Sequence, residues 1–358
     1  MPVFKAEQLK EIGLKIFRAA GASSKEAEIV SNHLVKANLR GHDSHGVLRI
    51  PWYYELIQKG YIKLGTEVEI LKDTAITALL DGNWGFGQVV ARVAMDIAIE
   101  RAKTYGLGMV AFFNTYHIGM LGEYSEMAAE QNLIGVTLCN GSPNVAPYGG
   151  KTPLLSTNPL SVAIPAASGR PVLLDMATSA VAAGKVSLAF QREVEVPLGW
   201  IIDKDGRPTT NPADLRPPLA EMPIPQGRVE RGSLLPLGGS LSGYKGYGLS
   251  LIIEILGGIL AGSGASDENR GNGVVTMAIN IEMFRPLNEF KEKVSRLIED
   301  VKASPKASGF SEILVAGEPE YREEEHRLRE GIYVEEATWK KLKQIASELD
   351  TPLEKTLN

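Results

Sequence analysis

Nine residues near the start of the chain, 41–49, bring together several side chains that can do chemistry. Their sequence, Gly-His-Asp-Ser-His-Gly-Val-Leu-Arg, holds two imidazoles, a carboxylate, a hydroxyl and a guanidinium. A histidine can transfer a proton near neutral pH, and an arginine offers a fixed fork of donors that fits a carboxylate. We therefore predict a place that holds and protonates a small organic acid, although a capped helix start with solvated histidines would share the pattern.

The local pattern indicates how this segment is positioned. Ser44 is a good N-cap for a following helix, which would put His45 near the start of that helix. Arg49 and Tyr53 are four residues apart and would share one helical face. His42 and His45 are only a weak metal pair, and no Cys-x-x-Cys or His-x-x-x-His spacing supports zinc, so we expect no metal site.

Two further polar residues follow predicted strands. Residues 109–113 are predicted to form a strand, and His117 lies just beyond its end. Residues 172–175 are predicted to form a buried strand that ends on the carboxylate of Asp175. That carboxylate either suits a ribose hydroxyl or caps the helix predicted to open at 176–179. Because ligands in α/β folds bind beyond the carboxyl ends of strands, both residues are candidate site residues.

Two glycine-rich segments could also meet a ligand. Residues 140–159 are predicted to form a long loop whose backbone N–H groups and small side chains can approach a bound group, although plain turn chemistry has the same composition. Lys245 lies in a predicted glycine-rich turn, 243–248, before an apolar helix predicted at 249–261. That position would suit a phosphate or a carboxylate.

The elements that must position these residues indicate an α/β fold. Strand, helix, strand, helix and strand follow one another over residues 74–138, which is typical of an α/β lobe. Residues 193–240 are rich in Pro and Gly and are predicted to form a lid-like excursion with a turn at 202–208. A helix capped by Ser23 and Glu26 is expected near the N-terminus. The other predicted helices cover 5–20, a segment ending near 60, 88–105, about 120–130, 176–189, 288–303, 321–330 and 335–349. The other predicted strands cover 74–80, 133–138 and 274–281, with an extended segment at 313–318.

Length and composition limit the class of protein. The 358 residues are 44% hydrophobic and 23% charged, which is typical of a globular protein with ample core. The net charge of −5 does not favour nucleic acid or an anionic membrane as a partner. Cys139 is the only cysteine and lies in an apolar run, so we expect a buried inert thiol. Neither a signal peptide nor a membrane-length apolar run is evident, so we expect a cytoplasmic protein.

Two common enzyme fingerprints are missing from the sequence. Nowhere does Gly-x-Gly-x-x-Gly follow a predicted strand and open a helix, as in the usual dinucleotide-binding motif. No Gly-x-Ser-x-Gly elbow favours a hydrolase of that kind. The residues alone therefore indicate an α/β enzyme that acts on a small anion with histidine acid/base chemistry, and they leave dehydrogenase, lyase and hydrolase open.

Seven motifs occur in a fixed order along almost the whole chain. They are Gly-His-Asp-Ser-His-Gly at 41–46, Tyr-His-Ile-Gly at 116–119, Val-Ala-Pro-Tyr-Gly-Gly at 145–150, Ser-Thr-Asn-Pro at 156–159, Leu-Asp-Met-Ala-Thr-Ser at 174–179, Tyr-Lys-Gly-Tyr-Gly at 244–248 and Gly-Glu at 317–318. Together they resemble the malate/L-lactate dehydrogenase family, also called type 2, which includes sulfolactate, ureidoglycolate and diketogulonate dehydrogenases. Residues 208–212 and 254–258 look most similar to its hydroxycarboxylate dehydrogenase B branch.

The resemblance implies a non-Rossmann α/β fold that binds NAD or NADP, which would explain the missing dinucleotide fingerprint. It also implies a homodimer with sites near the subunit interface and a small 2-oxo or 2-hydroxy acid as substrate. We expect a mainly helical lobe for substrate and dimerisation, built from residues 1–72 and 282–358. An α/β cofactor-binding lobe is expected over residues 73–281.

The resemblance assigns a role to each candidate at the substrate. His117 matches the family's proposed general acid/base, which would protonate the substrate oxygen as hydride arrives on the carbon. His45 matches a second histidine that other proposals make the proton donor; the sequence does not settle this choice, and our prediction favours His117. Ser44 would hydrogen-bond the reacting oxygen or orient His45, and Arg49 would clamp the carboxylate. Two further residues are predicted to bind substrate: Tyr53 and Thr157.

The resemblance also implies which residues bind the nicotinamide cofactor. These are Ser142, Asp175, Met176, Ala177, Lys245, Gly317 and Glu318. The choice between NAD and NADP and the identity of the substrate side chain stay open. Two other functions also stay open: reduction of a cyclic imine carboxylate on the same fold, and a binding protein without catalysis.

Overall fold

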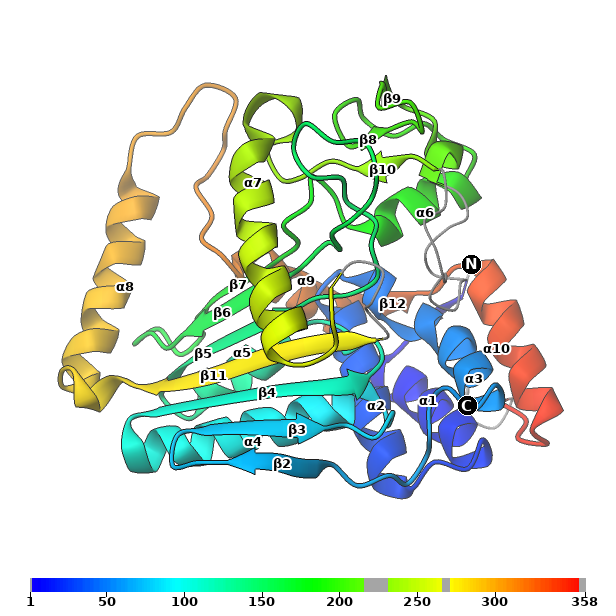
Figure 1. Ribbon diagram of the computed structural model, residues 1–358, viewed down its shortest axis with the longest axis horizontal. Coiled ribbons are helices and arrows are strands. Elements are labelled where there is room, and N and C mark those ends of the chain that lie inside the picture. The colour runs from blue at the N-terminus through cyan, green and yellow to red at the C-terminus, as the bar shows by residue number, and fades with distance from the viewer. Residues whose placement is uncertain (1, 216–230, 266–270, 354–358) are drawn as a thin grey trace.

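The computed structural model describes residues 2–215, 231–265 and 271–353, and it confirms the expected α/β class (Figure 1). The helices are α1 (Ala6–Ala19), α2 (Ser24–Leu39), α3 (Ile50–Gln58), α4 (Gly87–Tyr105), α5 (Gly122–Glu130), α6 (Ala183–Gln191), α7 (Gly239–Ile253), α8 (Leu287–Ala303), α9 (Glu318–Glu330) and α10 (Glu336–Glu348). The strands are β1 (Val3–Phe4), β2 (Glu69–Asp73), β3 (Thr77–Asp81), β4 (Leu107–Thr115), β5 (Leu133–Cys139), β6 (Leu160–Ile164), β7 (Val172–Met176), β8 (Ile201–Ile202), β9 (Pro208–Thr209), β10 (Ser233–Leu234), β11 (Asn272–Asn280) and β12 (Ile332–Tyr333).

A mixed sheet with the strand order β2-β3-β4-β11-β5-β6-β7 forms the centre of the fold. β3 and β4 pair in parallel, and the other neighbouring strands pair antiparallel. β11 comes late in the chain and lies between β4 and β5, so it joins distant parts of the sequence. Of the seven strands of this sheet, the sequence prediction omits β2 and β6. β2 is an exposed edge strand with a largely charged sequence, so it shows no alternation of apolar and polar residues.

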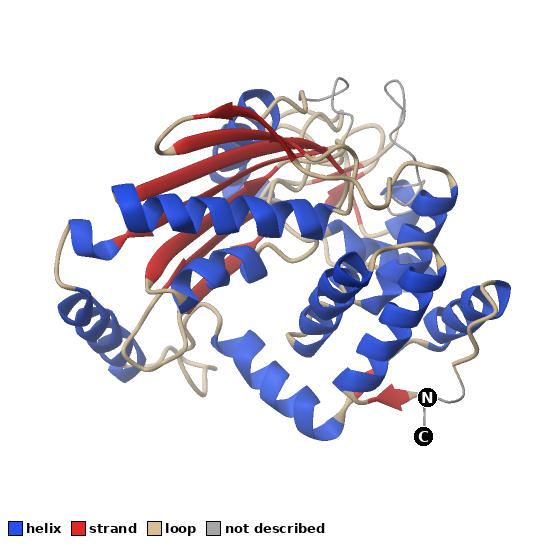
Figure 2. Cartoon of the chain, turned by 90° about the horizontal axis from the view of Figure 1, so that it is seen from below, coloured by secondary structure: helices blue, strands red, loops and turns tan. Residues whose placement is uncertain are grey.

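Helices cover both faces of this sheet, and glycines let them approach closely. α4 and α5 pack on one face, and α7 with the π-helical segment Glu254–Leu260 lies on the other (Figures 1 and 2). A Cβ atom at Gly108 would overlap the backbone of Ala98 in α4, and one at Gly135 would overlap the backbone of Ser125 in α5. These strand glycines therefore set the distance between helices and sheet.

A helical group with its own core packs beside the sheet. α1, α2, α3 and α10 share a buried apolar cluster that includes Phe17, Leu34, Tyr53 and Leu342. The short β1–β12 pair brings residues from near both ends of the chain into this group (Figure 1). The predicted cap of α2 is confirmed: Ser23 Oγ accepts a hydrogen bond from the backbone N–H of Glu26 at 3.2 Å.

Residues 193–240 are more than an excursion over the surface. β10, β8 and β9 form a small antiparallel sheet, and the predicted turn between two short strands at 202–208 is confirmed. This sheet shares a buried apolar cluster with α6, so it holds that helix in place. Residues 216–230 of the predicted excursion lie outside the described residues.

The expectation that Ser44 caps a helix is wrong. Residues 43–49 make two 3₁₀ turns instead, and α3 begins only at Ile50. Gly46 is extended (φ −88°, ψ −156°) and separates the two turns. The side chain of Asn38 in α2 accepts a hydrogen bond from the N–H of Val47 at 2.8 Å, so a tertiary contact replaces the local cap.

Two other helix starts also differ from the prediction. α6 begins at Ala183 rather than at 176–179, because Thr178 and Ser179 donate their hydroxyls to backbone carbonyls and keep residues 177–182 out of the helix. Residues 243–248 lie inside α7 rather than in a turn before it. A Cβ atom at Gly246 would overlap the backbone of Leu237, so this glycine permits a close contact. The predicted extended segment 313–318 ends in a turn, and α9 begins at Glu318.

Candidate active site

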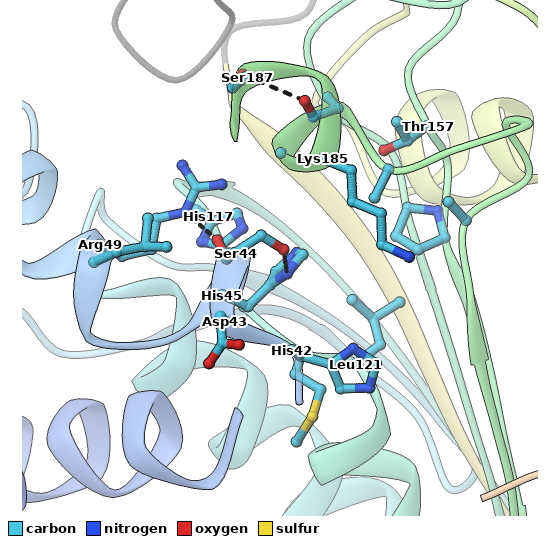
Figure 3. A pocket seen from close by; sticks show the side chains of 18 of the residues that line it. His42, Asp43, Ser44, His45, Arg49, His117, Leu121, Thr157, Lys185 and Ser187 are labelled. Carbon is cyan, nitrogen blue, oxygen red and sulfur yellow. Dashed lines mark hydrogen bonds between the residues drawn. The ribbon is translucent and has the colours of Figure 1, made fainter. Parts of the chain in front are cut away.

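A cavity of about 1600 Å³ lies where the helical group, the ends of several strands and α6 meet (Figure 3). One wall is shared by residues 40–49 and by residues 116–121, which follow β4. The facing walls come from segments 139–144, 156–159 and 175–188. Polar segments that are far apart in the sequence therefore meet at one site.

Two histidines stand side by side on the wall that residues 40–49 and 116–121 share. The rings of His45 and His117 are stacked, with their centroids 5.3 Å apart and an angle of 25° between their planes. The hydroxyl of Ser44 lies 2.9 Å from Nδ1 of His45, so it fixes the orientation of that ring. Since Ser44 and His117 both line the cavity, the structure brings the three predicted catalytic residues together.

Arg49 places its guanidinium beside these rings. Its Nε donates a hydrogen bond to the backbone carbonyl of Ser44 at 2.7 Å, and its Cζ lies 5.3 Å from the centre of the Trp52 ring. These contacts hold the planar fork in one orientation and leave its Nη groups for a ligand. Figure 3 shows Arg49 on the same side of the cavity as Ser44 and His117.

The charge state of the two histidines follows from their surroundings. Burial, and then the positive charge of Arg49, lower the pKa of His45 to about 3 and that of His117 well below its ordinary value. Both rings are therefore neutral at pH 7 in the free protein. An anion bound at Arg49 would offset part of this charge, so substrate binding and protonation of the rings favour each other.

A buried tyrosine and glutamine stand behind His117. Tyr53 Oη lies 2.7 Å from Nδ1 of His117, and Gln88 Nε2 donates a hydrogen bond to the same Tyr53 oxygen at 2.7 Å. Tyr53 does not line the cavity, so its contact in this structure is with His117 rather than with the substrate space. Gln88 is absent from the sequence prediction, because nothing in its local pattern reveals the contact with Tyr53.

The 43–49 segment is tied to the C-terminal part of the chain. Arg327 in α9 donates to both carboxylate oxygens of Asp43, at 2.6 and 3.1 Å, and to the backbone carbonyl of Asn38 at 2.7 Å. The side chain of Asn38 also donates to Asp43, at 2.6 Å. The Asp43 carboxylate therefore anchors the backbone segment that carries Ser44 and His45.

A second buried histidine supports the segment that carries His117. Nε2 of His33 accepts a hydrogen bond from the N–H of Met120 at 2.9 Å, and its Nδ1 lies 2.6 Å from a carboxylate oxygen of Glu123. Gly119 has a φ of +78°, and a Cβ atom there would overlap the His33 ring. His33 is fully buried, so its role is structural.

The predicted cofactor residues from the first half of the chain line the opposite part of the cavity. Ser142, Met176 and Ala177 lie on its wall, as does the predicted substrate residue Thr157. Asp175 is there too, and its Oδ2 accepts a hydrogen bond from the N–H of Gly122 at 2.6 Å. It therefore supports the start of α5, not of the helix that follows it, and burial raises its pKa.

The predicted cofactor residues from the second half of the chain lie away from the cavity wall. Lys245 is exposed on α7. Gly317 packs against Leu173, while Glu318 forms ion pairs with Lys302 at 2.5 Å and with Arg322 at 2.7 Å. The neighbouring residues 319 and 320 do line the cavity, so this segment reaches its edge.

The sequence prediction also omits a cation that faces the cavity. Lys185, in the first turn of α6, extends into the cavity across from Arg49 (Figure 3). Its side chain has no hydrogen bond or ion pair with any residue that the structure describes. The position depends on Gly184, where a Cβ atom would lie 2.7 Å from the Cβ of Ser44, so only glycine lets α6 approach this closely.

Two other features bear on the class of protein. Cys139 is buried as expected, and burial raises the pKa of its thiol to about 12, so it is a poor nucleophile. In the described parts of the chain, no helix is both long enough and apolar enough to cross a membrane.

The fold and the site together define an α/β enzyme with a histidine and arginine pair on a large cavity. The chain belongs to the malate/L-lactate dehydrogenase family, whose pattern it matches over residues 4–343. It is 40% identical to malate dehydrogenase of Pyrococcus abyssi over 95% of this chain and 93% of the relative. It is 37% identical to L-sulfolactate dehydrogenase of Methanocaldococcus jannaschii over 98% of each chain. The fold also matches the crystal structure of malate dehydrogenase from Entamoeba histolytica with a TM-score of 0.93, 33% identity and 99% coverage of both chains. The protein is thus a hydroxy acid dehydrogenase, and the resemblance inferred from its motifs is confirmed.

Proposed function

We propose that the protein interconverts a 2-oxo acid and a 2-hydroxy acid by hydride transfer, with NAD or NADP as the cofactor. The observation that carries this proposal is the placement of Arg49, His45 and His117 on one wall of the cavity. A carboxylate gripped by Arg49 would hold the adjacent carbon and its oxygen next to the two imidazoles. Membership of the family supports the same chemistry.

Four side chains on this wall would have separate roles in the reaction. Arg49 binds and orients the substrate carboxylate with its Nη groups, while its Nε stays on the Ser44 carbonyl. His117 gives a proton to the carbonyl oxygen during reduction and removes it during oxidation, using Nε2 because Nδ1 is held by Tyr53. Ser44 keeps His45 oriented as a second donor to the same oxygen.

The cavity also suits a nicotinamide dinucleotide. Its volume of about 1600 Å³ exceeds the ~300–1,000 Å³ of ordinary small-ligand sites, which leaves room for a dinucleotide beside a small acid. Ser142, Met176 and Ala177 would hold the cofactor with small side chains and backbone groups, and Asp175 would accept a hydrogen bond from a ribose hydroxyl. The bound nicotinamide would supply or receive the hydride.

We also propose that the protein is a cytoplasmic homodimer. Apolar side chains on α7 and the following π-helical segment are more than a third exposed, which is unusual for a contiguous surface. They are Leu241, Tyr244, Leu249, Leu251, Ile252, Ile255, Ile259 and Leu260. Lys245 lies on this helix, so its predicted cofactor contact would depend on the dimer. Sedimentation should give twice the mass of one chain, and Ile252→Glu should yield monomers.

A panel of 2-oxo acids, read with both reduced cofactors, tests the activity. Oxaloacetate, pyruvate, phenylpyruvate and sulfopyruvate should be included, with loss of nicotinamide absorbance as the signal. Turnover of at least one of them supports the proposal. Comparison of its rates with NADH and with NADPH identifies the preferred cofactor. If no 2-oxo acid is turned over but a piperideine or pyrroline carboxylate is, the protein is a cyclic imine reductase instead.

Two matched variants test which histidine transfers the proton. His117→Asn should reduce kcat by at least about 100-fold, because general acid/base catalysis contributes ~10²–10⁴-fold. His45→Asn should mainly weaken substrate orientation and reduce kcat by less. Titration of NADH fluorescence checks that both variants still bind the cofactor. If His45→Asn loses more kcat than His117→Asn, proton transfer is assigned to His45.

A further inference from the structure

A chain of hydrogen bonds runs from His117 away from the cavity into the core. Tyr53 Oη lies 2.7 Å from Nδ1 of His117, and Gln88 Nε2 donates to Tyr53 Oη at 2.7 Å. Tyr53 and Gln88 are each 1% exposed, so water does not compete for these bonds. The amide oxygen of Gln88, Oε1, is buried and has no hydrogen-bond partner among the described residues. A buried acceptor left unpaired costs free energy, which calls for an explanation.

The direction of these bonds fixes where the proton sits on the imidazole. A tyrosine hydroxyl has a single proton to donate. When Tyr53 accepts from the Gln88 amide nitrogen, its own proton points to Nδ1 of His117. A neutral His117 must then carry its proton on Nε2, the nitrogen left for the substrate.

That arrangement suits neither direction of the proposed reaction. To remove a proton from a hydroxy acid, Nε2 of His117 must have a free lone pair, so the ring proton must sit on Nδ1. Nδ1–H would then donate to Tyr53, whose own proton would need another acceptor. The same holds when His117 is protonated at both nitrogens to act as an acid. Phe17 and Phe86 flank the Tyr53 ring, so the acceptor within reach is the Gln88 side chain.

The unpaired oxygen of Gln88 meets this need. Turning the amide by about 180° exchanges Nε2 and Oε1, so the oxygen can accept the Tyr53 proton. One half of the amide is unpaired in either orientation, so the two orientations differ little in hydrogen bonding. Among the described residues, the groups that act on His117 from the other sides are Arg49, His45, His33 and Trp52, and none of them is a carboxylate.

We propose that Gln88 is a positioning residue that selects the tautomer of His117 through Tyr53. With the amide nitrogen toward Tyr53, His117 carries its proton on Nε2. With the amide oxygen toward Tyr53, the proton moves to Nδ1, and Nε2 becomes a base. This inference rests on the proposed acid/base role of His117 and extends it to a residue that touches neither substrate nor cofactor.

Two substitutions of similar size separate the positioning role from simple packing. Gln88→Glu offers Tyr53 a carboxyl oxygen, so it should hold His117 as the Nδ1–H tautomer and retain the rate of hydroxy acid oxidation within about threefold. Gln88→Met offers no acceptor, so His117 should stay as the Nε2–H tautomer. We expect Gln88→Met to lower kcat for oxidation about tenfold or more, with KM for the hydroxy acid changed less than threefold.

The tautomer itself can be measured without turnover. ¹⁵N chemical shifts of labelled histidine distinguish a protonated from an unprotonated ring nitrogen, and the chain has five histidines. The His117→Asn variant identifies the His117 signals. The expected result is that Nδ1 of His117 is protonated in Gln88→Glu and unprotonated in Gln88→Met.

The outcomes separate this inference from the proposed function. A His117 tautomer that is the same in both Gln88 variants overturns the inference, whatever the rates are. Equal loss of kcat in both variants, together with a lower unfolding midpoint, also overturns it, because packing alone then explains the residue. If the wild-type protein turns over no 2-oxo or 2-hydroxy acid, the proposed function fails, and the ¹⁵N shifts still test the coupling between Gln88 and His117.

Discussion

The His33–Glu123 pair makes a prediction whose sign can be checked by pH. His33 is fully buried, and because its Nε2 accepts from Met120, its proton sits on Nδ1, which faces Glu123 at 2.6 Å. Burial alone would raise the pKa of Glu123. The contact with His33 and the positive charges of Lys36 and Arg92 together outweigh burial and lower the pKa of Glu123 to about 2. Because the pKa of Glu123 is lowered in the folded protein, the ionised Glu123 contributes its full stabilisation above pH ~4.5.

Replacing His33 with leucine should reverse this behaviour. The Glu123 carboxylate would lose its main partner in a buried site, which typically costs ~3–5 kcal/mol. Burial would then raise the pKa of Glu123 above that of the unfolded chain. When folding raises the pKa of an acid, ionisation of that acid makes the folded protein less stable relative to the unfolded chain. The free energy of unfolding of the variant should therefore fall as the pH rises from about 5 to 8. In the wild type, the contribution of the Glu123 carboxylate stays constant over that range.

A double variant isolates the cause. In His33→Leu/Glu123→Leu an apolar pair replaces the ionisable one, so the pH dependence should disappear, and the remaining loss should be the ~1–3 kcal/mol of the unpaired Met120 N–H. Urea unfolding followed by tryptophan fluorescence at pH 5.5 and 8.0, at one protein concentration, measures all three proteins. If the free energy of unfolding of the single variant changes no more between pH 5.5 and 8.0 than that of the double variant, the reasoning is refuted.

Other predictions follow from the cavity and its supports. Because burial and Arg49 lower the pKa of His45 and His117, the base forms persist to lower pH, and kcat/KM for oxidation should stay flat from pH 8 to about 6; an inflection near 6.5 would contradict this. Arg49→Met should raise KM for any 2-oxo acid about 10–100-fold, measured by initial rates, since a charge-assisted contact is lost. Lys185→Met should raise KM for oxaloacetate about fivefold and leave KM for pyruvate nearly unchanged, because only oxaloacetate carries a second carboxylate. Arg327→Met should lower the unfolding free energy by about 1–2 kcal/mol and reduce kcat, and unchanged values of both would show that the 43–49 segment needs no anchor.

Local patterns predicted most elements of the fold, and the failures have a common cause. The capping box at Ser23 and the helical periodicity of α4 and α8 depend on residues within a few positions, so they are visible in sequence. The turns at 43–49 depend on Asn38, and the late start of α6 depends on carbonyls at 157 and 158. Contacts of this kind override local preference and cannot be seen in a window of the chain.

Some residues of the site could be predicted from the sequence, and others could not, for the same reason. Motif order alone indicated the family and pointed to Arg49, His45 and His117, because their chemistry is a property of the residue types. The sequence did not indicate Gln88 or Lys185, since an amide and a lysine acquire a role only through what lies next to them. Gln88 meets Tyr53 from 35 positions away, and Lys185 reaches the cavity because Gly184 lets α6 touch Ser44.

The sequence by itself therefore determined the kinds of chemical group that the protein carries and the local elements that hold them. Tertiary structure decided which groups share one cavity, how each proton is oriented and how far each pKa is displaced. The physical reason is that hydrogen-bond direction, desolvation and charge interactions depend on separations of a few ångströms. Such separations between residues as distant as Asp43 and Arg327 are set only when the helical group, the sheet and α9 pack together.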